Sequence, residues 1–215
     1  MKPLDECRLY TFVDTACLQG RKPEEVARQL CDGGADLIQL RAKTSAPEEI
    51  RRLAEALLPI TEQAGIGLVI NDHPRIARQI GAPLCHLGQE DFFNAGYRTA
   101  AQVTGCPKET RLGLSTHAPE QALRALRAEP DYIAIGPVYA TATKPGAKPV
   151  TLEYVRWAAA NVKIPWFAIG GINLDNLDEI LAAGATRICV VAAILHAPEV
   201  AQACQRFKQL LLSVP

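Results

Sequence analysis

The sequence predicts an α/β fold, a (β/α)8 TIM barrel in which residues 1–215 form a single domain. Three observations support this prediction. Eight short apolar runs recur along the chain, separated by longer stretches with helical periodicity. Glycine begins the segments 34–36, 81–83 and 184–186, each of which stands just before an apolar run. Polar residues gather after the apolar runs, at the end of each strand where barrels place their functional groups.

The apolar runs have the length and composition of buried strands. They cover residues 10–13, 37–40, 68–70, 84–87, 112–115, 132–135, 166–169 and 188–191. The clearest helices between them are expected at residues 23–31, 47–64, 119–128, 152–161 and 176–183. Several of these helices open with proline in the first turn, where its missing N–H costs nothing. Strands that alternate with helices pair in parallel through right-handed crossovers, and eight such units suggest a closed barrel.

An open, doubly wound sheet is the alternative arrangement of alternating strands and helices. That fold often carries a G-x-G-x-x-G turn after its first strand, whereas residues 13–16 of this chain read Val-Asp-Thr-Ala. No linker or low-complexity stretch divides the sequence. The sequence therefore favours one closed barrel.

Composition narrows the class of function. The chain has 23 basic and 23 acidic residues, without the basic excess or cluster that is typical of nucleic-acid-binding proteins. No apolar run approaches the roughly 18 residues of a membrane span, and no secretory signal is visible. The 7 cysteines are scattered, as expected for small core residues in a reducing compartment. We expect a cytoplasmic protein that binds neither nucleic acid nor membrane.

The polar residues that follow the strands form one set. They lie in six groups, at residues 39–43, 71–72, 86–91, 115–117, 141–144 and 170–171. The carboxyl ends of the parallel strands meet at one rim of a barrel, so these side chains are expected to surround a common site. One group could arise by chance, but six groups at the same rim predict an active site.

Gln39 and Arg41 are two residues apart on the second strand, so both side chains face the same way. Ile38 and Leu40 face the opposite way and suit contact with the helices. The polar pair is then expected to point into the mouth of the barrel. Because an unpaired buried arginine is costly, Arg41 predicts a bound anion or, as the alternative, a structural carboxylate partner.

Asp72 and Asp91 follow consecutive strands at the same rim as Arg41 and Lys43. Two carboxylates there suit a Mg²⁺ ion that keeps several waters and bridges to the phosphate oxygens of a substrate. They are too few to enclose a metal ion by themselves. The alternative role for Asp72 is to cap the helix that begins near Pro74.

A second anion site is expected where the last strands end. Gly170 and Gly171 let the backbone approach a phosphate, and the loops after strands seven and eight commonly form a phosphate site in barrels. The segment 141–146 adds two hydroxyls and an ammonium group, although alone it would be equally typical of a surface loop. His86 and His117 are expected at the same rim.

Together these groups resemble the thiamine-phosphate synthase family. The matching stretches run in the family's order and comprise residues 39–43, 70–72, 86–91, 113–117, 131–139, 141–144 and 168–172. The resemblance implies a barrel enzyme of thiamine biosynthesis, a transferase. Its expected reaction joins 4-amino-2-methyl-5-(diphosphooxymethyl)pyrimidine to 4-methyl-5-(2-phosphoethyl)thiazole and releases pyrophosphate.

The resemblance also implies a role for each site residue. Gln39 would contact the aminopyrimidine, and Asp72 and Asp91 would bind the Mg²⁺ cofactor. The diphosphate would be held by Arg41, Lys43, Asn71, Ser115 and Lys144, of which all but Asn71 are expected to be catalytic. The thiazole phosphate would be bound by Thr141, Thr143, the backbone of Gly171 and the backbone of Val191 and Ala192.

The implied reaction is dissociative, so the protein needs no nucleophile. Its task is to neutralise the leaving diphosphate and to align the two rings. Three positions depart from the family's usual pattern. His73 stands where arginine is usual, Ala192 where serine is common, and Thr151 where glycine is usual before the helix at 152–161.

Two other functions stay open at the level of the sequence. The thiazole tautomerase paralogue shares the barrel and the phosphate pocket, but it places a histidine acid/base where this chain has Pro137. A catalytically silent regulatory protein would have no need for the set Arg41, Lys43, Asp72 and Asp91. The sequence leaves the oligomeric state open, a homo-oligomer included.

Overall fold

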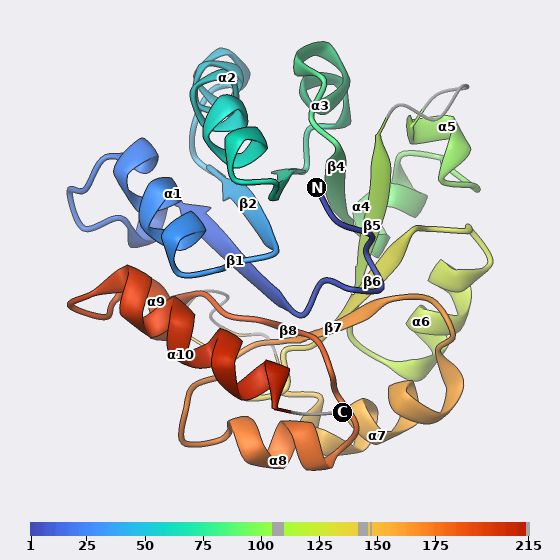
Figure 1. Cartoon of the computed structure of the whole chain (residues 1–215). Helices are drawn as coiled ribbons and strands as arrows, with labels where there is room; N and C mark the ends of the chain where they lie inside the picture. The colour runs from blue at the N-terminus through green and yellow to red at the C-terminus, as the bar shows by residue number, and fades with distance from the viewer. Residues whose placement is uncertain (105–109, 142–145, 147, 214–215) are drawn as a thin grey trace.

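Eight parallel strands close into a barrel in the computed structural model, which describes residues 1–104, 110–141, 146 and 148–213. The strands are β1 (Leu9–Asp14), β2 (Leu37–Arg41), β3 (Gly67–Asn71), β4 (Leu84–Gly88), β5 (Arg111–Thr116), β6 (Tyr132–Ile135), β7 (Trp166–Ile169) and β8 (Ile188–Cys189). They follow one another round the barrel in chain order, and β8 pairs with β1. Figure 1 shows the strands at the centre and the helices around them. The predicted barrel is confirmed, and the open sheet is excluded.

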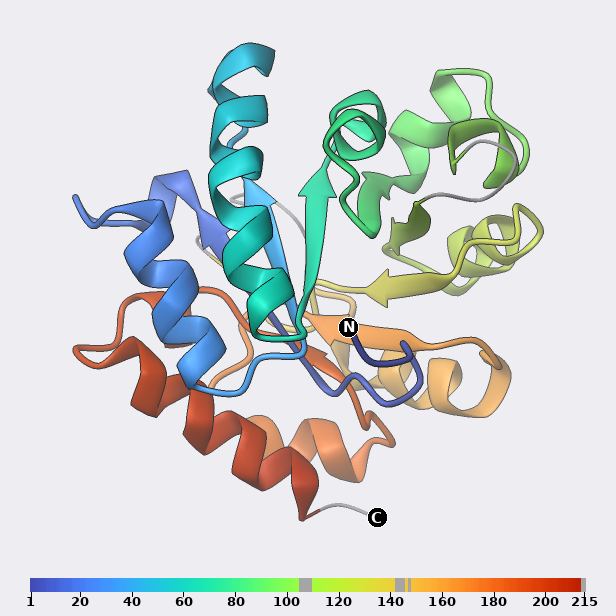
Figure 2. The same ribbon diagram turned by 45° about the horizontal axis from the view of Figure 1, so that its top comes forward.

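The helices cover the outside of the strands. They are α1 (Pro23–Asp32), α2 (Pro47–Gln63), α3 (Pro74–Ile80), α4 (Gln89–Asn94), α5 (Ala101–Thr104), α6 (Pro119–Leu126), α7 (Thr151–Asn161), α8 (Leu177–Ala182), α9 (Ala192–Leu195) and α10 (Val200–Leu212), with a 3-10 segment η1 (Thr15–Cys17). The long helix α2 is at the upper left of Figure 2. As expected from the sequence, α1, α2, α3 and α6 begin at proline, whose fixed φ suits the first helical turn. Within the described residues, no helix combines the length and apolar character needed to cross a membrane.

The core has two parts, because each strand is buried on both faces. Side chains such as Ile38 and Leu40 belong to the larger part, packed with the helices. The smaller part fills the barrel interior and consists of Leu4, Cys7, Tyr10, Phe12, Leu37, Val69, Leu84, Tyr132, Phe167 and Cys189. Their rings and aliphatic chains fill the barrel beneath its open end.

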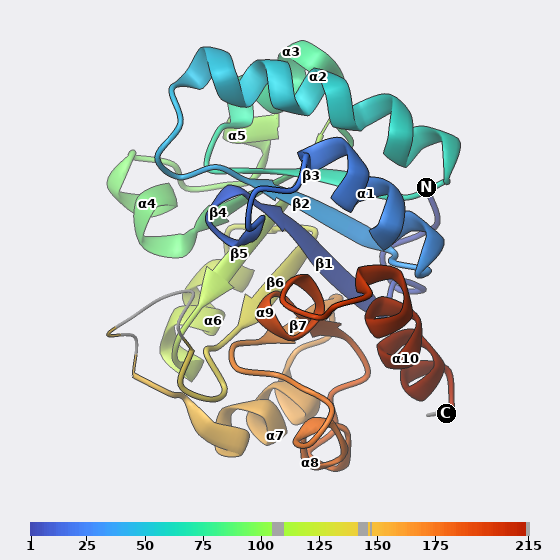
Figure 3. The same cartoon turned by 90° about the vertical axis from the view of Figure 1, so that its left-hand side faces the viewer.

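The last helix lies beside the first and completes the outer ring (Figure 3). The two helices approach so closely that a Cβ at Gly33, after α1, would lie 2.5 Å from the Cβ of Cys204 in α10. Asp36 ties this region together, since its carboxylate binds Lys2 at 2.6 Å and Lys208 at 2.5 Å. Burial favours a raised pKa for Asp36, but hydrogen bonds from the Leu9 amide and the two lysines outweigh it and lower the pKa.

The predicted helix ends agree with the structure within two residues, but the predicted end of the last strand is wrong. That strand was expected to reach residue 191, whereas β8 ends at Cys189. Val190 still donates its N–H to the carbonyl of Tyr10 at 3.0 Å. Val191 then turns away with φ −116° and ψ −85° to begin α9, so the backbone leaves the barrel one residue after that bond.

Candidate active site

A pocket of about 630 Å³ opens at the carboxyl ends of the strands. Every predicted site residue within the described part of the chain lines it, namely Gln39, Arg41, Lys43, Asn71, Asp72, Asp91, Ser115, Thr141, Gly171, Val191 and Ala192. The predicted residues Thr143 and Lys144 lie outside the described residues. The structure therefore brings the described candidates together around one cavity, whereas the role of each stays a prediction.

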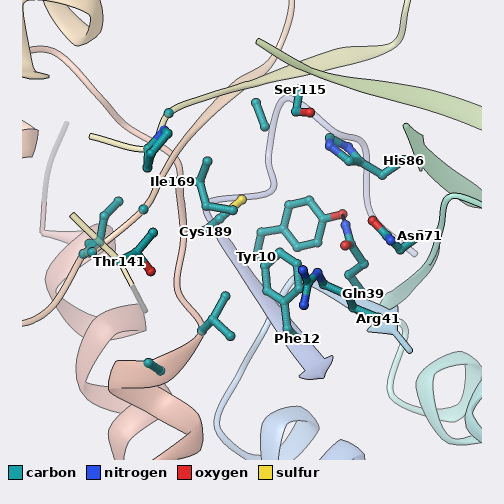
Figure 4. A pocket seen from close by; sticks show the side chains of 18 of the residues that line it. Tyr10, Phe12, Gln39, Arg41, Asn71, His86, Ser115, Thr141, Ile169 and Cys189 are labelled. Carbon is teal, nitrogen blue, oxygen red and sulfur yellow. Dashed lines mark hydrogen bonds between the residues drawn. The ribbon is translucent and has the colours of Figure 1, made fainter. Parts of the chain in front are cut away.

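The pocket has two chemically different sides. Figure 4 shows Gln39, Arg41 and Asn71 together on one side and Thr141 on the other. The first side comes from the ends of β2, β3 and β4 and, within the described part of the chain, carries the charged side chains of the pocket, Arg41, Lys43, Asp72 and Asp91. The second side comes from the segments after β6, β7 and β8 and consists of small and apolar residues with a few polar groups.

Arg41 is held by a buried carboxylate. Its Nη1 lies 2.7 Å from Oδ2 of Asp14, whose side chain is 1% exposed. Asp14 ends β1, and its other oxygen accepts the Ala16 N–H at 3.1 Å to start η1. The alternative reading of Arg41, a structural carboxylate partner, is therefore present in the structure. Sequence reasoning missed Asp14, although it stands at a strand's carboxyl end like the other site residues.

Lys43, Asp72 and Asn71 form a hydrogen-bonded group on the charged side of the pocket. Oδ2 of Asp72 accepts from Nδ2 of Asn71 at 2.7 Å and lies 3.2 Å from Nζ of Lys43. Asp72 has a φ of 61°, a left-handed conformation that non-glycine residues adopt at an energetic cost and often at functional sites. The alternative that Asp72 caps α3 is wrong, because His73 occupies the N-cap and makes no side-chain capping bond.

Asp72 and Asp91 offer oxygen donors that suit a hard cation. Asp91 lies in the first turn of α4, and its carboxylate packs over Gly88, where a Cβ would stand 2.8 Å from Oδ2. Both aspartates line the pocket and present carboxylate oxygens, the donors that Mg²⁺ prefers. Among the described residues no group of three or more His, Cys, Asp or Glu side chains gathers into a metal cluster. The residues present thus fit an ion that takes its remaining ligands from water and substrate.

The opposite side of the pocket is built on two glycines. Gly170 and Gly171 have φ values of 104° and 65°. A Cβ would lie 2.3 Å from Pro137 Cβ at the first position and 2.7 Å from Ala140 O at the second, so the loop accepts no larger residue without rearrangement. Asn176 fixes the loop by donating its Nδ2 to the Gly171 carbonyl at 2.9 Å. This wall can bring backbone N–H groups close to an anion.

The two histidines of the rim differ in environment. His86 is 8% exposed, and burial lowers its pKa to about 4 despite the charge of Asp72, so the ring is neutral. Its Nδ1 lies 3.0 Å from the hydroxyl of Tyr132. His117 also lines the pocket, and its Nδ1 contacts the carbonyl of Gly136.

Tyr10 and Phe12 form part of the pocket floor, although the sequence predicted them only as strand residues. Alternation alone does not say which face of a strand looks inward when both of its faces are buried.

Comparison with known proteins assigns this pocket to a family. Residues 9–194 match the sequence model of the family described as Thiamine monophosphate synthase. The thiamine-phosphate synthase of Thermus thermophilus is 44% identical over 189 residues, which cover 85% of each chain. The chain belongs to the thiamine-phosphate synthase family.

Other members of the thiamine-phosphate synthase family match nearly the whole chain. The relative from Thermobifida fusca is 41% identical over 215 residues, covering 99% of this chain and 95% of its own. A solved structure, thiamine phosphate pyrophosphorylase from Pyrococcus furiosus, is 29% identical with a TM-score of 0.86 and covers 98% of each chain. The predicted function, a thiamine-phosphate synthase and hence a transferase, is confirmed, and neither the tautomerase nor the silent regulatory protein is favoured.

The departures from the usual pattern of the thiamine-phosphate synthase family have different consequences here. Thr151 has a φ of 63°, which explains why glycine is usual at this position. Ala192 begins α9 and lines the pocket, although it brings no hydroxyl. His73 lies at the start of α3 and is not among the residues that line the pocket.

Proposed function

We propose that the pocket joins 4-amino-2-methyl-5-(diphosphooxymethyl)pyrimidine to 4-methyl-5-(2-phosphoethyl)thiazole, forming thiamine phosphate and pyrophosphate. One observation carries this proposal: a charged side at the ends of β2 to β4 faces a glycine-lined side at the ends of β6 to β8 across a single cavity. The first side suits a diphosphate with a cation, and the second suits a phosphate monoester held by backbone groups. A cavity with both sides can hold the two substrates with their reacting atoms together.

The leaving diphosphate is the group that the charged side would stabilise. In the proposed reaction the bond between the methylene carbon and the diphosphate oxygen breaks, and the electron pair leaves with the oxygen. Positive side chains near that oxygen lower the energy of the separated charges. Arg41 and Lys43 supply such charges, Asn71 and Ser115 supply polar groups, and we assign Lys144 the same role. The aminopyrimidine ring stabilises the methylene cation, so no protein nucleophile or base takes part.

Asp72 and Asp91 are the residues that would hold Mg²⁺. When bound, the ion would supply positive charge against the diphosphate. Asp72 is also hydrogen-bonded by Asn71, which orients its carboxylate, and it lies 3.2 Å from the ammonium group of Lys43. The charges of Lys43 and Asp72 thus partly offset each other in the pocket.

The glycine-lined side would hold the thiazole phosphate. Thr141, Gly171, Val191 and Ala192 line it. We assign the phosphate to the backbone of the last three, to Thr141 and to Thr143. Because the backbone N–H of residue 192 serves whatever its side chain is, the missing hydroxyl at Ala192 is of little consequence. The nitrogen of the thiazole ring then donates its lone pair to the methylene carbon, which forms the C–N bond of the product.

The proposal extends to the context of the reaction. The two substrates are small molecules, and we propose neither nucleic acid nor membrane as a partner. Six cysteines in the described residues are free thiols, which is compatible with a cytoplasmic location. We treat residues 1–215 as one catalytic domain and leave the homo-oligomeric state open.

The test is a reconstitution with both phosphorylated substrates. We expect thiamine phosphate and pyrophosphate to form in equal amounts in the presence of Mg²⁺, measured by chromatography and mass spectrometry. Reactions that lack one substrate, or that contain a chelator, are the controls. Conversion of a thiazole precursor without any pyrimidine would support the tautomerase instead, and absence of product in the complete reaction would contradict the proposal.

A further inference from the structure

A chain of four buried polar side chains crosses the floor of the pocket. Nε2 of Gln39 lies 2.6 Å from the hydroxyl of Tyr10, which lies 3.1 Å from the hydroxyl of Tyr132. That hydroxyl is 3.0 Å from Nδ1 of His86. The four residues come from β2, β1, β6 and β4, so the chain links strands far apart in the sequence. Figure 4 shows Tyr10, Gln39 and His86 grouped on the floor.

Packing holds this chain in place. Tyr10 and Tyr132 are 0% exposed, and the ring of Phe167 meets both edge to face, with centroids 5.4 and 5.6 Å away. Gly113 pairs with Tyr132 across β5 and β6. A Cβ at Gly113 would lie 2.0 Å from Cζ of Tyr132, so the tyrosine ring occupies the space that the glycine leaves. The rings have little freedom, and the hydroxyl positions follow from them.

The chain has only two self-consistent directions, because each phenol has one proton to donate. In one direction Gln39 donates to Tyr10, Tyr10 to Tyr132, and Tyr132 to His86. In the reverse direction His86 donates first and Gln39 accepts last through its Oε1. The structure places Nε2 of Gln39, the donor, on Tyr10. That placement selects the first direction, in which Nδ1 of His86, 3.0 Å from the Tyr132 hydroxyl, is the final acceptor.

We infer that Tyr10, Tyr132 and His86 are positioning residues that fix the amide of Gln39 with its oxygen available to the pocket, and that they thereby select a pyrimidine ring with an exocyclic amine. This role rests on the proposed function and explains how the pocket would distinguish an aminopyrimidine from other pyrimidines. With Nε2 committed to Tyr10, Gln39 presents an acceptor, Oε1. An amine donates to that acceptor, whereas a ring carrying an oxo group at the same place presents a second acceptor and is rejected.

Loss of the Tyr132 hydroxyl tests this directly. In Tyr132→Phe the proton of Tyr10 has no fixed acceptor on that side and can turn toward Gln39. The amide can then reverse, and the site becomes more tolerant of the oxo ring. We expect the preference for the aminopyrimidine diphosphate over its oxo analogue to fall roughly tenfold, the size expected from one buried hydrogen bond.

The matched control is Tyr154→Phe. Tyr154 is 3% exposed and its hydroxyl bonds to Oγ1 of Thr116 at 2.7 Å, so this variant also loses a buried, hydrogen-bonded tyrosine hydroxyl, but one that lies outside the Gln39–Tyr10–Tyr132–His86 chain. Equilibrium binding of the two pyrimidine diphosphates, measured calorimetrically without thiazole phosphate, needs no turnover. Tyr10→Phe provides a second reading should Tyr132→Phe fold poorly.

The inference predicts a reduced amine preference in Tyr132→Phe and Tyr10→Phe, and the parental preference in Tyr154→Phe, with unchanged affinity for thiazole phosphate in all three. Equal weakening of both pyrimidines would show a purely structural role and would overturn it, as would an unchanged preference. The reconstitution assay fails or succeeds separately: a parent protein that binds with this preference but forms no thiamine phosphate would contradict the proposed reaction and leave the positioning chain standing.

Discussion

Nη1 of Arg41 lies 2.7 Å from Oδ2 of Asp14, and the arginine side chain is 20% exposed while the aspartate is 1% exposed. The carboxylate is therefore fixed by the fold, and the guanidinium reaches from it into the pocket. A fixed partner limits the orientations that Arg41 can adopt, and it also cancels the charge that Arg41 brings. Asp14 thus weakens the attraction of Arg41 for an anion but fixes the orientation of the guanidinium. A fixed orientation matters most when charge develops on the leaving diphosphate.

We predict that Asp14→Asn lowers kcat without weakening the binding of pyrophosphate. Asparagine keeps the oxygen that accepts the Ala16 N–H, but it releases Arg41 and leaves the pocket one unit more positive. We expect kcat to fall about tenfold, because orientation is lost, and pyrophosphate affinity to stay the same or rise. Glu48→Gln, which breaks an exposed ion pair with Arg51, is the control for charge alone. Weaker pyrophosphate binding with parental kcat would contradict this role.

Lys43→Ala should affect turnover far more than stability. The lysine side chain is 52% exposed and its ion pair with Asp72 is 3.2 Å long, so its removal should change the free energy of unfolding by less than about 0.5 kcal/mol. Loss of a charge on the leaving group should lower kcat by about 10²-fold. Denaturant unfolding and steady-state kinetics at saturating substrate measure the two effects, with the exposed Lys163→Ala as control. The same loss is predicted for Lys144→Ala, and near-parental activity would remove either lysine from the mechanism.

His117→Asn should keep much of the activity. The histidine lines the pocket and could be mistaken for a base, but no proton has to leave before the C–O bond breaks in a dissociative reaction. Its ring contacts the Gly136 carbonyl, a bond that asparagine can in part replace. Parallel kinetics of His117→Asn and Lys43→Ala decide the matter. A loss as large as that of the lysine variant would assign His117 a catalytic role and revive the tautomerase reading.

Thr151→Gly should stabilise the protein. A residue with a Cβ loses roughly 1–2 kcal/mol in the left-handed region, and threonine has a φ of 63° here. Glycine removes that strain but loses more backbone entropy, so we expect a net gain of about 0.5–1 kcal/mol in unfolding free energy. Thr151→Ala, which keeps the Cβ and loses the weak 3.3 Å bond from Glu153 N–H, should give no gain. Equal stability of the alanine and glycine variants would contradict the prediction, because it would show that the strain does not exceed the entropy that glycine loses.

The fold was predictable because each strand is a short apolar run and several helix-to-strand joints carry a glycine that ends the helix. Gly81, for example, caps α3 with a φ of 73°, a conformation that sequence reasoning assigns to glycine. The end of β8 was not predictable, since the same valines suit a strand and the start of α9. The pattern of apolar residues does not record the turn at Val191.

Some residues of the candidate site were likewise predictable from the sequence, and others were not. Residues such as Lys43 and Asp91 stand at strand ends and are polar, so position and chemistry both mark them. Asp14 carries the same signal but was overlooked, because no resemblance pointed to it. The partnership of Tyr132 with His86 was beyond reach, since it joins residues 46 positions apart through inward faces that are apolar in pattern. Pairing across a barrel is a property of the closed sheet and not of any one segment.

The most direct test of the charged side of the pocket is the coupling between Mg²⁺ and pyrophosphate. Asp72 and Asp91 supply two carboxylates, and Mg²⁺ takes six oxygens, so most of its ligands must come from water and the diphosphate. Titration calorimetry of pyrophosphate, with and without Mg²⁺, should show roughly 5–150-fold tighter binding with the ion, and reciprocally for Mg²⁺. Asp91→Asn should lose most of this coupling and keep its affinity for thiazole phosphate, while Glu90→Gln, one residue away and exposed, should retain the coupling. Equal pyrophosphate affinity of the parent protein in both conditions would contradict the assignment of these aspartates to the metal.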